Sequence, residues 1–216
     1  KLLDTTIIEY QIPMGSLGQW LRVDEDAFLP TQESYLQACP NKTRQMQKKY
    51  RELADDKLLV GISWKSTGID KKRAHTKNVP LKYWIPILSR QDCYFISLQY
   101  GDIREDIEEH TSAFGCPIYI DEEIDSLENL DDFAAQVSVL DLIISTSNAT
   151  VHVAGGLGKR VWVLLSSRPD WRWMLNRDDS PWYQTVRLFR QEKLGDLERM
   201  LQRVNFALGK DCRLCN

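Results

Sequence analysis

The sequence has no apolar run long enough to span a membrane. Even its longest apolar runs, such as Val161–Leu165, are far shorter than the roughly 20 residues that a spanning helix requires. The chain also begins at Lys1, with neither an initiator methionine nor the charged and then apolar pattern of a secretion signal. We therefore expect a piece of a longer or processed protein that lies in the cytoplasm and has no membrane span.

The chain also lacks a dense stripe of basic residues, which a protein that binds a nucleic-acid backbone needs. Its 28 Lys and Arg residues are outnumbered by 31 Asp and Glu residues, so the net charge is -3. The one basic cluster surrounds Lys71–Arg73 and includes Lys77. Because this cluster is local, it suits a single anionic ligand, and we expect no nucleic-acid partner.

Cysteines are few, and no residues have the spacing of a metal site. The five cysteines form an odd, scattered set that suits reduced thiols better than a disulfide framework. Cys212 and Cys215 make a lone CxxC pair, whereas a zinc site would need two more ligands nearby. The pair Asp121 and Glu122 is interpreted as the end of a strand. The sequence thus predicts no metal site and no bound cofactor.

What the chain does contain is an alternation of short apolar runs and helical patterns from Leu58 onward. Such an alternation indicates βαβ units, and hence a parallel sheet with helices on both faces. The predicted fold class is α/β, a Rossmann-like doubly wound parallel sheet over residues 58–216. The candidate strands are 58–64, 94–99, 118–120, 140–145, 160–165 and 185–189, and the candidate helices are 81–89, 103–114, 130–137, 149–157 and 194–208.

Residues 1–57 have a different pattern. A possible strand at 5–10 is followed by a Pro- and Gly-containing loop at 12–18 and by a charged helix at 41–53. We interpret this segment as the remnant of a preceding domain together with a linker.

In a doubly wound sheet, ligands bind at the carboxyl ends of the strands. The fourth predicted strand is followed by small polar residues that open a helix, and a helix start offers free N–H groups and partial positive charge to a phosphate. A helix N-cap is the simpler explanation of any one of these residues. The residues predicted to contact a nucleotide at these strand ends are Ser63, Trp64, Gln99, Tyr100, Ser147, Asn148, Ala149 and Thr150.

Two further residues are candidates for chemistry. Lys65 follows the first strand and is predicted to lie beside a diphosphate, with Arg73 or Lys77 closing over it. His152 falls one turn into the helix that follows Asn148, although a partly buried structural histidine is the simpler interpretation. The GxxxxGK[ST] spacing of a P-loop is missing around Lys65, which argues against nucleoside triphosphate hydrolysis.

Four stretches give the chain a resemblance to a known family: 60–65, 95–102, 130–135 and 141–159, with the later blocks 169–173 and 179–183. They resemble the C-terminal half of a GT-B glycosyltransferase, and in particular the heptosyltransferase-like domains at the end of bacterial tetratricopeptide-repeat proteins. The resemblance implies that 58–216 binds a nucleotide-sugar donor without a metal. It also implies that Lys65 and His152 act in catalysis, and that most of the acceptor domain, with its general base, is missing.

The sequence departs from this family at one motif. Heptosyltransferases show Asp-[ST]-Gly-x-x-His where this chain has Ser147-Asn-Ala-Thr-Val-His152. The donor sugar and the acceptor are therefore open, and we expect the fragment alone to be inactive. Two alternatives remain, a non-catalytic nucleotide-binding or protein-interaction module and a nucleotide-sugar epimerase of related architecture.

Overall fold

The computed structural model describes residues 10–28, 34–66, 76–115 and 117–211. Contacts within the chain divide it into two units, 1–31 and 32–216, and each is described by itself. In the first unit the predicted loop at 12–18 contains the 3-10 turn η1 (Met14–Ser16) and leads into the one-turn helix α1 (Gly18–Leu21). The possible strand at 5–10 lies outside the described residues, apart from Tyr10.

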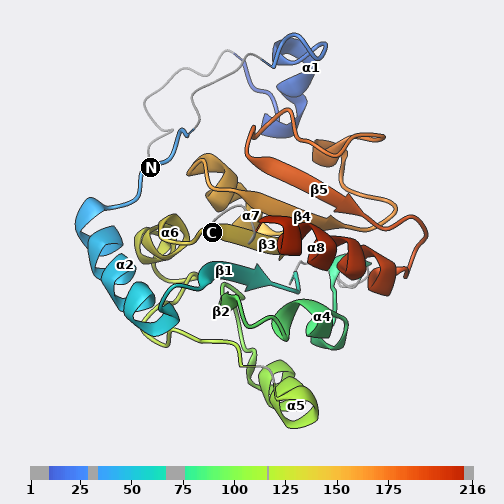
Figure 1. Ribbon diagram of the computed structural model, residues 1–216. Coiled ribbons are helices and arrows are strands. Elements are labelled where there is room, and N and C mark those ends of the chain that lie inside the picture. The colour runs from blue at the N-terminus through green and yellow to red at the C-terminus, as the bar shows by residue number, and fades with distance from the viewer. Residues whose placement is uncertain (1–9, 29–33, 67–75, 116, 212–216) are drawn as a thin grey trace. The chain divides into compact units, whose positions relative to one another are not determined.

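The second unit is built on a five-stranded, all-parallel sheet with strand order β2-β1-β3-β4-β5 (Figure 1). In the interior strand that contains Val60, this residue pairs with Phe95 on one side and with Leu142 on the other. The predicted Rossmann-like fold class is confirmed. The strands are β1 (Leu58–Ser63), β2 (Cys93–Ser97), β3 (Leu142–Thr146), β4 (Val161–Leu165) and β5 (Val186–Arg190).

One predicted strand is wrong. The segment at 118–120 forms only an isolated bridge, in which Tyr119 pairs with Ile96 at the outer edge of β2. Pro117 has no N–H group to extend the ladder on one side, and the chain turns at Asp121 on the other.

The helices follow the predicted order. The predicted helix at 81–89 is divided into a 3-10 turn and a short α-helix, because Pro86 removes an N–H group and occupies the first turn of a new helix. The helices of this unit include α2 (Pro40–Ala54), η2 (Leu81–Trp84), α4 (Ile85–Leu88), α5 (Arg104–Phe114), α6 (Leu130–Ser138), α7 (Ala149–Gly156), η3 (Trp171–Trp173) and α8 (Leu197–Asp211).

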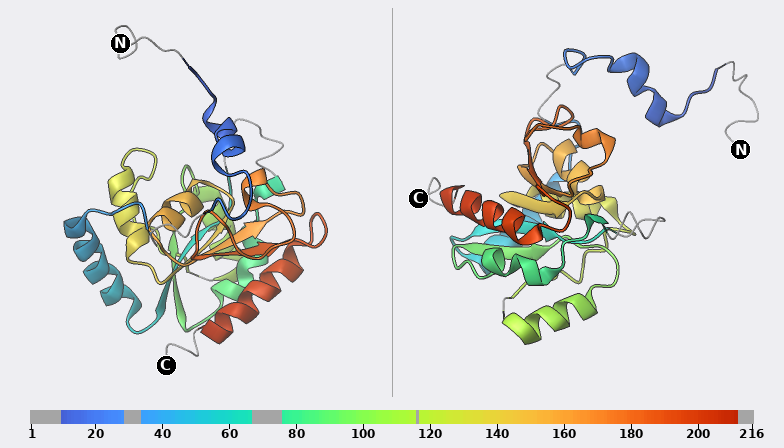
Figure 2. Two further views of the ribbon diagram at one scale, coloured as in Figure 1. Left: turned by 90° about the horizontal axis from the view of Figure 1, so that it is seen from above. Right: turned by 90° about the vertical axis from the view of Figure 1, so that its right-hand side faces the viewer.

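Helices cover both faces of the sheet, and successive strand residues alternate between the two apolar cores. Ile143 packs with α2, α6 and α7, whereas its neighbours Leu142 and Ile144 pack with η2, α4 and α8. The view from above in Figure 2 shows α8 (red) on one side of the sheet and α2 (blue) with α6 (yellow) on the other. Because both faces are covered, the strands read as continuous apolar runs in the sequence.

The helix α2 belongs to this unit although it precedes the predicted domain boundary at 57/58. Its Tyr50 is fully buried, and the Tyr50 hydroxyl donates a hydrogen bond of 2.8 Å to the buried carboxylate of Asp121. Lys49 donates to the same carboxylate at 2.9 Å, and Gln136 donates to the Tyr50 hydroxyl. The origin of residues 1–57 in an acceptor domain stays a prediction.

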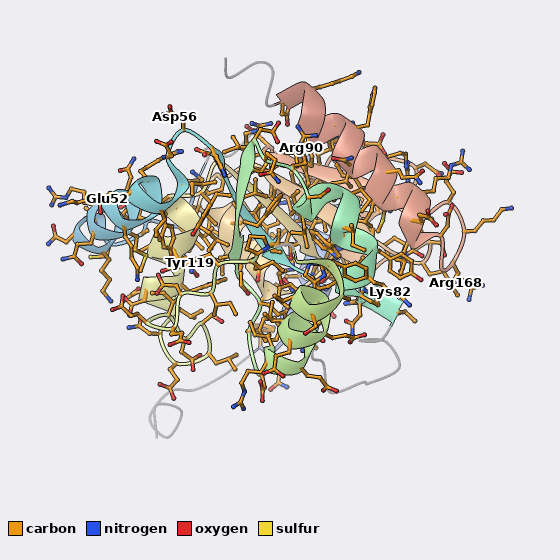
Figure 3. All side chains as sticks on the ribbon, turned by 60° about the horizontal axis from the view of Figure 1, so that its bottom comes forward. Glu52, Asp56, Lys82, Arg90, Tyr119 and Arg168 are labelled. Carbon is orange, nitrogen blue, oxygen red and sulfur yellow. The ribbon has the colours of Figure 1, made fainter. Side chains whose placement is uncertain are left out.

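Charged side chains such as Glu52, Lys82 and Arg168 lie on the outside of this unit (Figure 3). Among the described residues, no helix has the length and apolar character needed to cross a membrane. Cys39 is a free thiol, and the CxxC pair lies outside the described part of the chain.

We expect Asp121→Ala to lower the free energy of unfolding by about 3 kcal/mol, because it leaves the buried Tyr50 hydroxyl without an acceptor and Lys49 without its buried partner. Urea denaturation measures this loss. Glu123→Ala is the matched control, since Glu123 also binds Lys49 but its side chain is 82% exposed. Equal losses in the two variants would contradict the role given to the buried carboxylate.

A buried histidine makes stability depend on pH. His110 in α5 is 2% exposed, and neither ring nitrogen has a hydrogen-bond partner among the described residues. Burial lowers the pKa of its imidazole below the ordinary value of 6.5. As the pH falls below about 6.5, the unfolded chain therefore binds a proton that the folded chain resists, and stability is lost.

His110→Leu should remove this contribution. Its free energy of unfolding should fall less than that of the wild type when the pH is lowered from about 8 to about 5.5. Denaturation curves at the two pH values measure the difference. If both proteins lost the same free energy of unfolding between the two pH values, the burial of neutral His110 would not be the cause of that loss.

Candidate functional site

The candidate site lies where β1 and β3 run side by side. From this pair, the chain continues outward to β2 on one side and to β4 and β5 on the other. In sheets of strand order 2-1-3-4-5, the carboxyl ends of strands 1 and 3 border the crevice in which ligands bind. The residues that leave this edge are Trp64–Ser66 after β1 and Ser147–Asn148 after β3.

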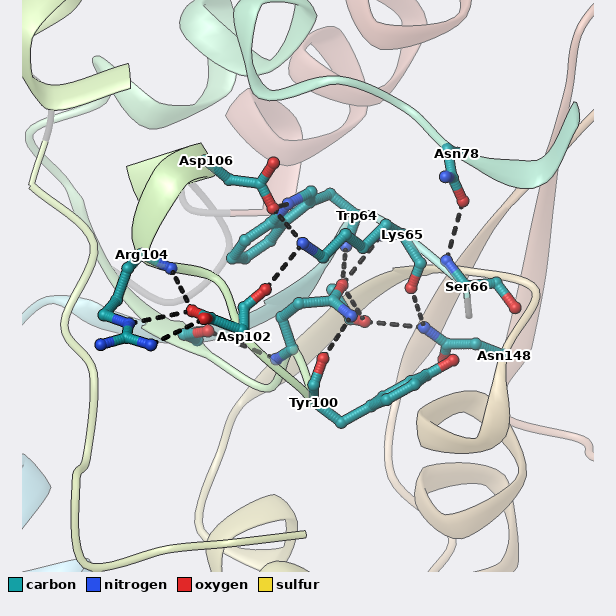
Figure 4. A network of polar contacts seen from close by, with 12 residues as sticks. Trp64, Lys65, Ser66, Asn78, Tyr100, Asp102, Arg104, Asp106 and Asn148 are labelled. Carbon is teal, nitrogen blue, oxygen red and sulfur yellow. Dashed lines mark hydrogen bonds and ion pairs between the residues drawn. The ribbon is translucent and has the colours of Figure 1, made fainter. Parts of the chain in front are cut away.

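Asn148 joins the two strand ends. Its Nδ2 donates to the Ser63 Oγ at 2.7 Å and to the Lys65 carbonyl at 3.2 Å (Figure 4). Its Oδ1 accepts from the Thr150 backbone N–H and from the Ser145 hydroxyl, both at 3.1 Å. The side chain is therefore the N-cap of α7 and is fully used within the protein, with 7% of the residue exposed.

Gln99, which follows β2, fixes the end of β1 from the other side. Its Oε1 accepts three hydrogen bonds, from the Ser63 hydroxyl at 3.0 Å, the Trp64 N–H at 2.9 Å and the Lys65 N–H at 2.8 Å. Its Nε2 donates to the Tyr100 carbonyl. Gln99 is 8% exposed, so this geometry gives it a positioning role within the strand ends.

The ammonium group of Lys65 lies at the start of α5. Its Nζ is 2.5 Å from the Asp106 carboxylate and 3.0 Å from the Asp102 carbonyl (Figure 4). An open groove of about 500 Å³ surrounds it and is lined mainly by acidic residues of α5. Arg104 donates to Asp102 and holds the pKa of that carboxyl at about 2. Lys65 is thus paired with a carboxylate on the β2 side of the crevice.

The first turn of α7 follows β3 at the carboxyl edge of the sheet, beside the end of β1. Ala149 is exposed, so a ligand can approach the backbone there. Ser147 accepts a 2.8 Å hydrogen bond from the Trp173 indole, and the buried hydroxyls of Thr146 and Thr150 have no hydrogen-bond partner among the described residues. The partial positive charge of a helix start favours an anion at this position.

His152 lies on the β4 side of this helix start. Its Nδ1 is 2.9 Å from the Tyr183 hydroxyl, and its ring stacks on Trp173 with 5.7 Å between ring centroids. Burial lowers the pKa of the His152 imidazole, and the charges of Arg172 and Lys77 lower it further while Asp170 opposes them. The ring is therefore neutral at neutral pH.

The two adjacent glycines of α7 make room for this arrangement. A Cβ atom on Gly155 would lie 2.6 Å from the Tyr183 ring, and one on Gly156 would lie 2.8 Å from Leu36. Both glycines thus pack closely against side chains of distant segments.

The structure brings the predicted residues together in two groups. One is a network of Ser63, Trp64, Gln99 and Asn148, which Tyr100 joins through its carbonyl; the other is formed by Ser147, His152 and the first α7 turn. Sequence reasoning missed Asp106 as the partner of Lys65, because an acidic residue in the first turn of a helix is common. Arg73 lies outside the described residues. Within the described part, no three His, Cys, Asp or Glu side chains gather as metal ligands would.

Comparison with known proteins gives one relative in sequence and several in fold. No family model matches the chain. It is 33% identical over 200 residues to Protein FlbA of Caulobacter vibrioides, a match that covers 93% of this chain and 33% of FlbA. The chain therefore spans about a third of that relative's length.

The solved structures are similar at low sequence identity. E. coli ADP-heptose LPS heptosyltransferase II matches with 14% identity and a TM-score of 0.56, over 82% of this chain and 54% of that chain. The glycosyl transferase family 9 structure from Veillonella parvula matches with 12% identity and a TM-score of 0.55, over 85% and 47%. E. coli heptosyltransferase WaaC with ADP-2-deoxy-2-fluoro heptose matches with 12% identity and a TM-score of 0.51, over 73% and 44%. The chain thus has the fold of about half of each structure.

Gln99→Leu should lower the free energy of unfolding by about 2 kcal/mol, because three donors at the end of β1 lose their common acceptor. Gln99→Glu keeps an acceptor oxygen at that position and should lose less. Chemical denaturation of both variants at neutral pH tests this. A Leu variant as stable as the wild type would show that Gln99 does not hold the strand end.

Proposed function

We propose that this chain is the donor-binding part of a glycosyltransferase and that it holds the phosphate of a nucleotide sugar at the start of α7. The observation that carries the proposal is the position of that helix start at the β1/β3 crevice, where Asn148 locks both strand ends and leaves the exposed Ala149 backbone open to a ligand. The likeness in fold to heptosyltransferases supports it.

The proposed chemistry is the stabilisation of a departing phosphate without a metal. When the sugar is transferred, negative charge grows on the phosphate oxygens, and preorganised donors at the helix start bind that charge. Each such donor commonly contributes about 3 kcal/mol to the transition state. Lys65 adds its charge only after it leaves Asp106, which is within its hydrogen-bonding reach in the structure.

In this proposal, the base or ribose lies on the Tyr100 side of the crevice, and the acceptor and its general base belong to the remainder of the protein. The chain matches about half of each heptosyltransferase structure, which supports a partner domain in the remainder of the protein. By the resemblance of its sequence, the chain is the C-terminal half and follows a repeat domain in a bacterial cytoplasmic protein.

One observation favours a second function, a non-catalytic module of the same fold. The side chains of Ser63, Gln99 and Asn148 are satisfied within the protein, and Lys65 is paired with Asp106. Such a site needs no ligand to complete its hydrogen bonds.

Calorimetric titration with UDP, GDP, ADP and CMP tests the proposed function. We expect one nucleotide to bind selectively, and Lys65→Ala to weaken its binding about tenfold or more, since it removes a contact to phosphate. Asp106→Asn should strengthen binding, because it frees the Lys65 charge while an amide oxygen still accepts from the Trp64 indole.

Lys48→Ala is the matched control, since Lys48 is a cation on α2 whose side chain is 80% exposed. It should leave the affinity unchanged. If the folded chain bound none of the four nucleotides, the donor-binding proposal would fail for this chain and the non-catalytic module would be favoured.

A further inference from the structure

An aromatic pocket lies beside the start of α7, on the side away from Lys65. It has a volume of about 130 Å³ and is lined by His152, Trp171, Arg172, Trp173, Trp182 and Tyr183. The bond from the Trp173 indole to Ser147 Oγ connects the pocket wall to the first residue after β3. When the phosphate of a ligand binds at the helix start, the group attached to that phosphate can therefore reach this pocket.

The walls of the pocket do not form a slot for a flat base. The planes of Trp171 and Trp182 meet at 79°, and those of His152 and Tyr183 meet at 51°. One face of Trp173 is covered by His152, and the Arg172 guanidinium lies over the Trp171 ring at 4.8 Å. Steeply inclined rings with polar groups between them suit a non-planar ring that has apolar C–H faces and hydroxyl edges.

Three hydrogen-bonded side chains lead to the pocket. The Tyr183 hydroxyl is 3.3 Å from the Tyr35 hydroxyl and 2.9 Å from Nδ1 of His152. In the tautomer in which Nδ1 accepts from Tyr183, the neutral imidazole carries its proton on Nε2. Nε2 has no hydrogen-bond partner among the described residues and is available to an oxygen atom of a ligand.

We propose that this aromatic pocket is the subsite for the pyranose ring of the donor sugar, with the ring packed against Trp171 and Trp182 and with His152 Nε2–H donating to a sugar oxygen. The inference rests on the proposed function, which places the phosphate at the α7 start and the base on the opposite side, near Tyr100. The inference adds that the pocket binds the sugar part of the donor and that Trp171, Trp182 and His152 select this sugar.

The test compares each nucleotide with its sugar conjugate on the same variants of the whole chain. The probes are UDP-glucose, GDP-mannose, ADP-glucose and CMP-N-acetylneuraminate, each against the free nucleotide. Trp171→Ala should weaken the best sugar conjugate about fivefold and leave the free nucleotide unchanged, because it removes an aromatic face that only the sugar contacts. Trp171 is 58% exposed, so its loss should not disturb the core.

Two further variants sharpen the result. Trp171→Phe keeps an aromatic face and should restore part of the affinity for the sugar conjugate. Phe206→Ala removes an aromatic side chain of α8 that is 66% exposed and should change neither affinity. Saturation-transfer NMR on the wild type should show protein contacts to the pyranose protons, and these should decrease in Trp171→Ala.

The outcomes separate the two proposals. If the free nucleotide binds but Trp171→Ala weakens it as much as the sugar conjugate, the pocket holds the nucleotide part and the sugar subsite is overturned. If Trp171→Ala changes neither affinity, the subsite is overturned while nucleotide binding stands. If no nucleotide or conjugate binds to the folded chain, the proposed function fails and the subsite fails with it.

Discussion

The hydrogen bonds of the Asn148 amide are the interaction on which the candidate site depends. Its Nδ2 reaches the end of β1 while its Oδ1 caps α7, so one side chain sets both the distance between the strand ends and the position of the helix start. Gln99 adds the end of β2 to the same network. Three strand ends are therefore held before any ligand arrives, and the open donors at the start of α7 need little rearrangement to bind a phosphate.

This rigidity leaves Lys65 as the group whose position has to change. Its pair with Asp106 is partly exposed, with 23% and 34% of the two side chains accessible, and pairs of this kind contribute only about 0.2–1 kcal/mol. A phosphate near the α7 start can therefore compete for the ammonium at small cost. In the absence of a phosphate, Asp106 keeps the Lys65 ammonium on the β2 side. The acidic side chains of the α5 groove disfavour the binding of an anion on that side.

Sequence patterns predicted most of the sheet and little of the site's geometry, for a physical reason. Four of the five strands, β1 to β4, are largely buried and give local apolar runs, whereas the bridge at Tyr119 lacks enough backbone partners to become a strand. Lys65 and Asn148 were placed at the correct strand ends. Their partners Asp106 and Ser63 lie 41 and 85 residues away, and only the register of the folded sheet decides those contacts.

The segment before the sheet supports the pocket wall, and local sequence patterns miss this support. The backbone N–H groups of Tyr35 and Leu36 both donate to the Gly156 carbonyl at 2.9 Å, and the Tyr35 ring stacks on Tyr183. The two glycines of α7 leave room for this packing. A Cβ atom on Gly155 would collide with Tyr183, and one on Gly156 would collide with Leu36. Tyr183, which contacts His152, is thus held by a residue of the segment 1–57 that the sequence assigned to a domain remnant and linker, so a fragment cut at residue 58 would lose a support of its own site.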